Sequence, residues 1–262
     1  MKWDDATSLE LKALAPSAVV VVPVASIEQH GPHLPVGTDS FITEGVAARM
    51  DEACGDRLLV LPVLRFGCSD HHMAFCGTLS VKHETFAAVV MEVLGSIVHH
   101  GFRRILLLNG HGGNAAIGGV IAERAAREWP EAEVVMTNVF RVASEPISKI
   151  IQGTYPAVGH ACEFETSVML ALKPELVRMN LAEDDGLPPA APHLRGDMLR
   201  GPVATLALPF HKVTRRGVFG RPTLATEEKG RRFLDVIVSA LRDLVVGCWP
   251  DALLKPLPPE RA

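Results

Sequence analysis

Short, uninterrupted apolar runs alternate with longer amphipathic stretches along most of this chain. The runs cover residues 18–24, 58–61 and 105–108, with a weaker fourth at 133–136. Continuous apolar runs indicate strands that are buried on both faces, as in parallel sheets. The stretches between and after them predict helices over about 39–54, 83–100, 114–129 and 226–246. This order predicts an α/β fold, a three-layer α/β/α sandwich with a mostly parallel central sheet.

The segment from about 179 to 222 breaks this alternation. It contains prolines at 188, 189, 192, 202, 209 and 222. We expect irregular loops there, with one short strand at 205–208, lying either over an active site or at a subunit contact. Because α/β chains of this length often form one unit, we treat residues 1–262 as a single domain.

Composition and charge exclude several classes of partner. The formal net charge is −4, and no stripe of lysine or arginine appears, so we expect neither nucleic acid nor an anionic membrane as a partner. The five cysteines form no C-x-x-C pair, which favours reduced thiols in a cytoplasmic protein. The first residues are acidic where a signal peptide would be basic, and no apolar run approaches the ~20 residues that span a bilayer.

Acidic and imidazole side chains follow the first predicted strand, within residues 26–39. If the backbone is still extended there, Glu28 and His30 point to the same side because they are two residues apart. The turn at Gly31-Pro32 then lets the chain fold back and bring Asp39 to the same place.

Two later segments carry the same kinds of side chain. Asn-Gly-His-Gly-Gly-Asn at 109–114 follows the third predicted strand, and its glycines allow a sharp turn from which His111 projects. Residues 159–167 contain His160 and two acids, Glu163 and Glu165. Ligands of open α/β sheets bind beyond the carboxyl ends of the strands, so we expect the three segments to meet there.

Carboxylates and imidazoles gathered at one strand end need a counter-charge, because like-charged carboxylates repel in a partly dry cleft. Two divalent metal ions per subunit would supply it, and mixed oxygen and nitrogen ligands suit Zn²⁺, Mn²⁺ or Fe²⁺. Such a pair lowers the pKa of a water and polarises a carbonyl oxygen. The sequence therefore predicts hydrolysis of an amide or related C–N bond.

Two other functions stay open on the residues alone. Cys162 is a candidate nucleophile with His160 as its base, although the acids Glu163 and Glu165 beside it would raise the thiol pKa. A non-catalytic module that binds a small ligand is the other, because α/β sheets bind such ligands at the same crevice.

The segments that carry these side chains resemble the motifs of the creatininase (creatinine amidohydrolase) family. Residues 28–39 match its E-Q-H-G-P-H-L-P-x-x-T-D signature, and 109–114 match its N-G-H-G-G-N loop. Residues 160–167 match its H-A-G-E-x-E-T-S element, with Cys162 in place of the glycine. Weaker matches are 72–80, where the family usually has F-P-G-T-L-S and this chain has Cys76, and 217–226.

The resemblance implies a metallo-amidohydrolase acting on a non-peptide C–N bond of a small, linear or cyclic substrate. It implies that Glu28 and His111 bind one metal, His30 the other, and Asp39 both. His160 would carry the proton to the leaving nitrogen. It also implies a homo-oligomer, often a hexamer, and leaves open the deformylase and peptidase branches of the family.

The motifs leave the identity of the last metal ligand open, because Gly113 stands where creatininase proper has an acid. The resemblance to members that share the N-G-H-G-G-N loop implies that the acid comes from the later element. We nominate Glu165, with Glu163 as the alternative.

Overall fold

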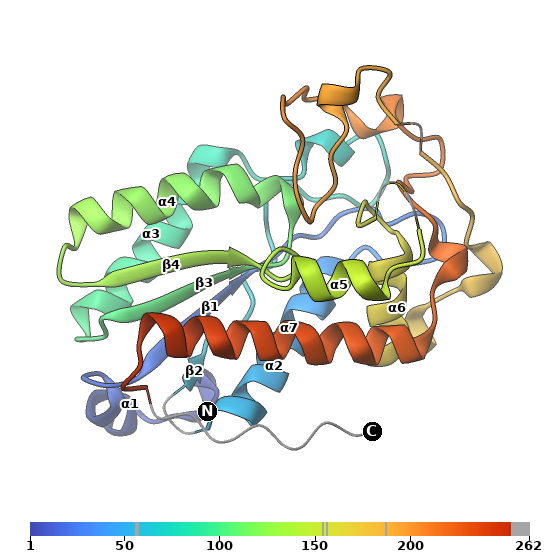
Figure 1. Cartoon of the computed structure of the whole chain (residues 1–262). Helices are drawn as coiled ribbons and strands as arrows, with labels where there is room; N and C mark the ends of the chain where they lie inside the picture. Colours follow the sequence, from blue (N-terminus) through green and yellow to red (C-terminus); the bar gives the residue numbers. More distant parts are fainter. Residues whose placement is uncertain (56–57, 154, 156, 187, 253–262) are drawn as a thin grey trace.

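A four-stranded parallel sheet forms the centre of the molecule (Figure 1). The computed structural model describes residues 1–55, 58–153, 155, 157–186 and 188–252. In the order β2-β1-β3-β4, the strands are β2 (Leu58–Val60), β1 (Val19–Val24), β3 (Arg104–Asn109) and β4 (Glu133–Asn138). All four apolar runs therefore form strands, and the predicted parallel sheet is confirmed.

Helices connect the strands and cover the sheet. The α-helices of the described residues are α1 (Ser8–Leu14), α2 (Thr38–Cys54), α3 (His83–His99), α4 (Ala115–Glu128), α5 (Ser144–Ile150), α6 (Glu163–Leu172) and α7 (Glu227–Cys248). Short 3₁₀ helices lie between them: η1 (Trp3–Asp5), η2 (Asp70–His72), η3 (Gly112–Asn114), η4 (Pro174–Leu176), η5 (Met179–Leu181), η6 (Pro192–Leu194), η7 (Phe210–Lys212) and η8 (Pro222–Leu224). The four predicted helices match α2, α3, α4 and α7 within about two residues at each end.

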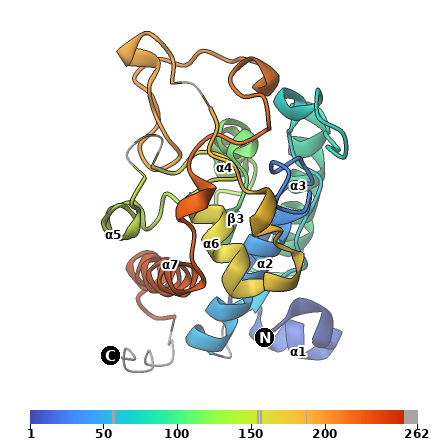
Figure 2. The same ribbon diagram turned by 90° about the vertical axis from the view of Figure 1, so that its right-hand side faces the viewer.

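The layers follow from the alternation of side chains along β1. Val19 and Val21 belong to a core shared with α2, α6 and α7, whereas Val20 and Val22 belong to a second core shared with α3 and α4. Figure 2 shows α7 and α3 on opposite sides of β3. A strand covered on both faces must be apolar at every position, which is why the run is continuous. The predicted three-layer α/β/α sandwich is confirmed.

Strand register places the ends of the strands level with one another. Val24 pairs with Asn109 at the ends of β1 and β3, and Asn109 pairs with Asn138 at the end of β4. The segments that leave these strands therefore emerge side by side at one edge of the sheet, where an α/β fold places its ligands. In the described part of the chain, no helix combines the length and the apolar character needed to cross a bilayer.

The irregular segment from 179 to 222, gold to orange in Figure 1, contains only short 3₁₀ helices among its described residues. The prediction of a strand at 205–208 is wrong, because those residues form no strand. Pro202 and Pro209 flank them, and Leu206 is 57% exposed rather than packed into a sheet. Apolar residues form a strand only where a sheet edge is available to pair with.

Helices α6 and α7 approach each other closely at Gly230. A Cβ atom there would lie 1.8 Å from the carbonyl oxygen of Ser167 in α6, so only glycine allows this distance. Beside it, the Lys229 ammonium lies 2.6 Å from Glu163 Oε1, and both side chains are almost fully buried. The same ammonium donates to the carbonyl oxygen of Leu224, and Glu163 accepts from the backbone N–H of Gly153. These contacts fix the position of α6, which carries Glu165.

Replacing Gly230 by alanine tests the close approach of the two helices. We expect Gly230→Ala to lower the free energy of unfolding by about 1–3 kcal/mol, because the added methyl group meets backbone that cannot turn away. Gly119→Ala is the matched control, since Gly119 lies in α4 with no atom within 4 Å of its Cβ position. The control should stabilise the protein by about 0.5–1 kcal/mol through helix propensity. Urea denaturation measures both, and equal stabilisation would contradict the packing.

Removing the buried ammonium tests the ion pair that holds α6. Lys229→Met should cost about 3–5 kcal/mol in denaturant unfolding, because the Glu163 carboxylate is left buried without its cation. Lys149→Met removes the cation of an exposed pair with Glu145 in α5 and should leave stability nearly unchanged. Equal losses in the two variants would show that burial does not set the strength of the Glu163–Lys229 pair.

Candidate metal centre

Glu28 and His30 lie on the segment that follows β1, and Asp39 lies in the first turn of α2. Gly31, with a φ of +65°, allows the chain to turn back between them. His30 Nε2 is 3.1 Å from Asp39 Oδ1, and all three side chains are buried. The structure therefore brings together the three residues that the sequence analysis expected to converge.

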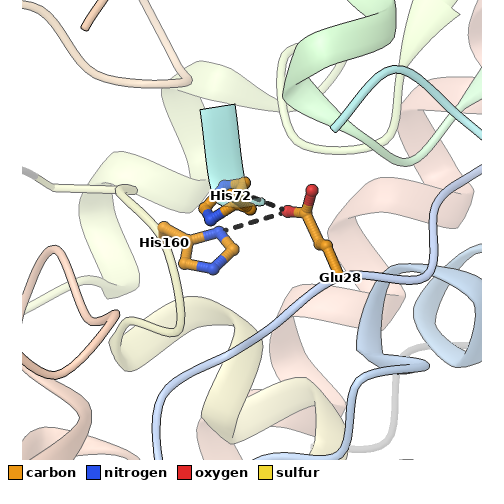
Figure 3. Close-up of side chains that lie close together, drawn as sticks. All are labelled: Glu28, His72 and His160. Carbon is orange, nitrogen blue, oxygen red and sulfur yellow. Dashed lines mark ion pairs between the residues drawn. The ribbon is translucent and has the colours of Figure 1, made fainter. Parts of the chain in front are cut away.

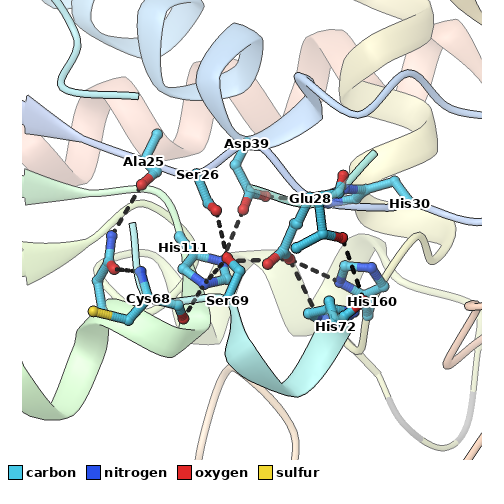
Figure 4. A network of polar contacts seen from close by, with 12 residues as sticks. Ala25, Ser26, Glu28, His30, Asp39, Cys68, Ser69, His72, His111 and His160 are labelled. Carbon is cyan, nitrogen blue, oxygen red and sulfur yellow. Dashed lines mark hydrogen bonds and ion pairs between the residues drawn. The ribbon is translucent and has the colours of Figure 1, made fainter. Parts of the chain in front are cut away.

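The asparagines of the 109–114 loop join it to its neighbours. Asn109 Nδ2 donates to the carbonyl oxygen of His111, which holds the turn in place. Asn114 donates to the carbonyl oxygen of Ala25 and accepts from the backbone N–H of Cys68. Figure 4 shows Ala25, Cys68 and His111 in this network. The loops after β1, β2 and β3 are thus held against one another by amide side chains.

At two positions of this loop, neighbouring atoms lie too close to leave room for a Cβ atom, so glycine is required. A Cβ atom at Gly110 would lie 1.7 Å from Thr43 Oγ1, and one at Gly113 would lie 2.1 Å from the carbonyl oxygen of Cys68. Any larger residue at either position would push the loop away from α2 or from the Cys68 segment. His111 would then move away from Asp39.

Asp39 lies between two groups of side chains, with one oxygen toward each. Its Oδ2 is 2.8 Å from His111 Nδ1, which is also 3.4 Å from Glu28 Oε1. Its Oδ1 faces His30 Nε2, which is 3.7 Å from Glu165 Oε1. Asp39 therefore turns one oxygen toward each group, which is the geometry that a carboxylate needs to bridge two cations.

Backbone carbonyls decide which nitrogen of each imidazole faces this cluster. His30 Nδ1–H donates to the carbonyl oxygen of Glu28 at 3.1 Å, because a carbonyl can only accept. His111 Nε2–H donates to the carbonyl oxygen of Cys68 at 3.0 Å. In the neutral form, each ring then presents a lone pair toward Asp39. Such a second contact is what orients a metal-binding histidine.

Several buried atoms of the cluster have no hydrogen-bond partner among the described residues. They are Glu28 Oε2, His30 Nε2, Asp39 Oδ2 and Glu165 Oε2. Buried polar atoms without partners are rare and costly, so this group calls for positive charge among the carboxylates, as protons on the imidazoles or as metal cations. Carboxylate oxygens together with imidazole nitrogens are ligands for Zn²⁺, Mn²⁺ or Fe²⁺. The residues present therefore fit divalent metal ions.

The pKa directions agree with this need for positive charge. Burial lowers the pKa of His30, but the charges of Asp39 and Glu165 outweigh it and place the pKa well above the ordinary imidazole value. Burial also lowers the pKa of His111, but the charge of Glu28 outweighs it, so this pKa too lies well above the ordinary imidazole value. Burial raises the pKa of Glu165. Protons would meet the demand for positive charge here, and so would metal cations.

His160 and His72 also face the Glu28 carboxylate (Figure 3). His160 Nδ1 is 3.5 Å and His72 Nε2 is 3.4 Å from Glu28 Oε1. His160 Nε2–H donates to the carbonyl oxygen of Gln29 at 2.7 Å, and the Gln29 amide donates to His72 Nδ1 at 2.8 Å. Burial lowers the pKa of His160 well below its ordinary value and that of His72 to about 3.

His72 and its neighbour His71 are site residues that the sequence analysis missed. Both belong to η2, in the loop after the predicted strand at 58–61, and the sequence analysis named no candidate at that strand end. The signal for His72 was its place at the start of the 72–80 segment, one of the weaker matches to the family motifs. The same loop supplies Ser69, whose hydroxyl lies 3.2 Å from His111 Nε2.

Glu163 and Cys162 are placed elsewhere. The Glu163 carboxylate is occupied by Lys229 and by backbone N–H groups, whereas Glu165 extends toward His30. Cys162 is fully buried, and burial together with Glu165 raises the pKa of its thiol to about 12. A thiol with that pKa provides almost no thiolate, which argues against Cys162 as a nucleophile.

Comparison with known proteins identifies relatives along most of the chain. The family described as "Creatininase: Creatinine amidohydrolase" matches residues 4–245. A mycofactocin precursor peptide peptidase of Mycobacterium tuberculosis is 33% identical, with 89% of this chain and 86% of that protein covered. A creatinine amidohydrolase of Pseudomonas putida is 29% identical, with 90% and 92% covered. A 3-dehydro-scyllo-inosose hydrolase of Thermotoga maritima is 30% identical, with 87% and 76% covered.

Solved structures share the fold. A putative creatinine amidohydrolase from Bacteroides fragilis superposes with a TM-score of 0.78 at 27% identity, covering 94% of each chain. A mutant creatininase described as "Zn-Zn type" has a TM-score of 0.76 at 26% identity, with 95% of this chain and 98% of that chain covered. Sheet, loops and sequence thus agree over nearly the full length, and this chain belongs to the creatininase family of hydrolases.

Proposed function

We propose that this protein is a metal-dependent amidohydrolase that uses two divalent metal ions to cleave a C–N bond of a small amide. The observation that carries the proposal is the position of Asp39. Its two oxygens face His30 and His111, and each imidazole is fixed by a backbone carbonyl on its far side. The related mutant creatininase of "Zn-Zn type" also supports a pair of ions.

The ligands divide into two sets that share Asp39. Glu28 and His111 would hold one ion, and His30 and Glu165 would hold the other. When bound, such ions polarise an amide carbonyl and lower the pKa of a water, which allows hydrolysis near neutral pH. Zinc, manganese and iron all suit this donor set.

His160 is the residue that we propose to move the proton. Its Nε2–H is held by the carbonyl oxygen of Gln29, so Nδ1 is the nitrogen free to accept and release a proton. Nδ1 lies beside Glu28 Oε1, which would stabilise the charged ring during the transfer. In the overall reaction the water oxygen adds to the carbonyl carbon and a water proton passes to His160 Nδ1, the C–N bond breaks, and the leaving nitrogen takes that proton from His160.

His72 supports this arrangement from the opposite side. Gln29 donates to its Nδ1, which leaves the hydrogen on Nε2, 3.4 Å from Glu28 Oε1. We propose that His72 orients the Glu28 carboxylate, and that Gln29 couples the positions of the two histidines.

The type of amide is broader than the sequence analysis expected. The relatives do not support a restriction to non-peptide C–N bonds. One is named as a creatinine amidohydrolase, but another is named as a precursor peptide peptidase. We therefore propose an amide substrate without that restriction. The deformylase branch, the homo-oligomer, the single domain over 1–262 and the cytoplasmic location stay predictions.

Removing the bridging charge tests the metal pair. Asp39→Asn should retain less than half of the wild-type metal, measured by elemental analysis, and lose hydrolysis of a panel of formamides, cyclic ureides and short peptides. Asp70→Asn is the control, because Asp70 is an exposed acid in η2. Chelation of the wild type should lower its melting temperature, because the free energy of unfolding falls by on the order of 3 kcal/mol if the metal was 100-fold above its Kd. Full metal content in Asp39→Asn would overturn the bridge.

Replacing His160 separates proton transfer from metal binding. His160→Gln should reduce kcat by about 10²–10⁴ while metal content stays at the wild-type level. His193→Gln, which changes an exposed histidine of η6, should have no effect. Loss of metal together with activity would make His160 a ligand instead, and unchanged kcat would remove it from the reaction.

A further inference from the structure

An apolar cavity of about 200 Å³ lies within the irregular segment. Its walls include Leu194, Leu206, Leu208, Phe210, Val213 and Phe219, and none of the described lining residues carries a charge. The phenolic O–H of Tyr155, also in the wall, donates to the carbonyl oxygen of Gly196, so the polar end of that side chain is already paired. The cavity therefore has the chemistry to accept a hydrocarbon group.

Two of its lining residues contact the histidines beside Glu28. The Phe210 ring centroid lies 4.3 Å from that of His72 and 4.9 Å from that of His160. Phe219 exchanges two backbone hydrogen bonds with His160, at 2.9 and 2.8 Å. The cavity therefore adjoins His72 and His160 through Phe210 and Phe219, and no residue of the metal centre is among its described lining residues.

This position explains residues that the sheet did not explain. Leu206 and Leu208 belong to the run that was expected to form a strand, and they are 57% and 39% exposed. Exposed apolar side chains gathered around a hollow mark a binding site more often than a neutral surface. These two leucines line the cavity and belong to no strand.

We propose that this cavity binds an apolar substituent on the amine side of the scissile bond. The inference rests on the proposed function, because His160 delivers its proton to the leaving nitrogen and the cavity adjoins His160. An engineered cavity of about 150 Å³ lined by aliphatic and aromatic residues binds benzene, so the cavity has room for a phenyl or isobutyl group. The substrate class is an amide of an apolar amine, which includes peptides cleaved before a large apolar residue.

A pair of isomeric amides tests whether the cavity binds the amine side or the acyl side of the scissile bond. N-benzylacetamide carries its ring on the amine side, and N-methyl-2-phenylacetamide carries the same atoms on the acyl side. With metal-loaded enzyme, we expect kcat/KM to be at least about tenfold higher for N-benzylacetamide than for its isomer or for N-methylacetamide, since even one methylene in an apolar pocket is worth that much. Equal values for the two isomers, or a preference for the acyl-side ring, would overturn the inference.

Variants of the wall identify the cavity as the source of the preference. Leu208→Trp fills the space and Leu206→Asp places a charge in its wall, and either should remove the preference for N-benzylacetamide over its isomer. Val203→Trp is the matched control, because Val203 is 85% exposed in the same segment and is not a lining residue. A preference that survives both wall variants would overturn the assignment.

Calorimetric binding keeps this inference separate from the proposed function. Metal-loaded His160→Gln should bind N-benzylacetamide at least about tenfold more tightly than its isomer, and Leu206→Asp in that background should lose the difference. If wild-type enzyme hydrolyses no amide, the proposed function fails, but this binding difference still measures the cavity. If amides are hydrolysed and the binding difference is absent, the cavity assignment fails and the proposed function stands.

Discussion

Three buried carboxylates around a shared set of imidazoles impose the main constraint on this structure. Burial raises the pKa of Glu165, while neighbouring imidazoles lower those of Glu28 and Asp39. Such a group is stable only if positive charge is present among the carboxylates, as protons on histidine or as metal ions. The backbone carbonyls of Glu28 and Cys68 contribute by fixing the rings of His30 and His111. The surrounding structure holds these side chains in place despite their mutual repulsion.

The sheet and the α6–α7 pair position these carboxylates in different ways. Because β1 and β3 are neighbours in register, the loops that bear Glu28 and His111 leave the sheet side by side. Glu165 comes instead from α6, which is held by the close approach at Gly230 and by the buried Glu163–Lys229 pair. Because the centre depends on two separate packing systems, no single local motif defines it.

Apolar runs in the sequence predicted the strands whose own residues show that both faces are buried. The runs at 18–24 and 105–108 read as buried strands because both faces of the sheet are covered. The run at 205–208 has similar composition but failed as a strand, since no sheet edge lies beside it and its leucines line a cavity. The sequence pattern shows that a residue is apolar, but whether it packs in a sheet or lines a cavity depends on the rest of the chain.

The sequence by itself determined the fold class, the family motifs and the convergence of Glu28, His30, Asp39 and His111, because strand topology brings the loops after β1 and β3 together in any fold of this kind. Only the tertiary structure distinguished the surroundings of Glu163 from those of Glu165: residues two apart on a helix point about 200° away from each other, so one pairs with Lys229 and the other faces His30. It also placed His72 beside Glu28, buried the Cys162 thiol and formed the apolar cavity. Each depends on contacts between segments distant in the chain, which local pattern does not encode.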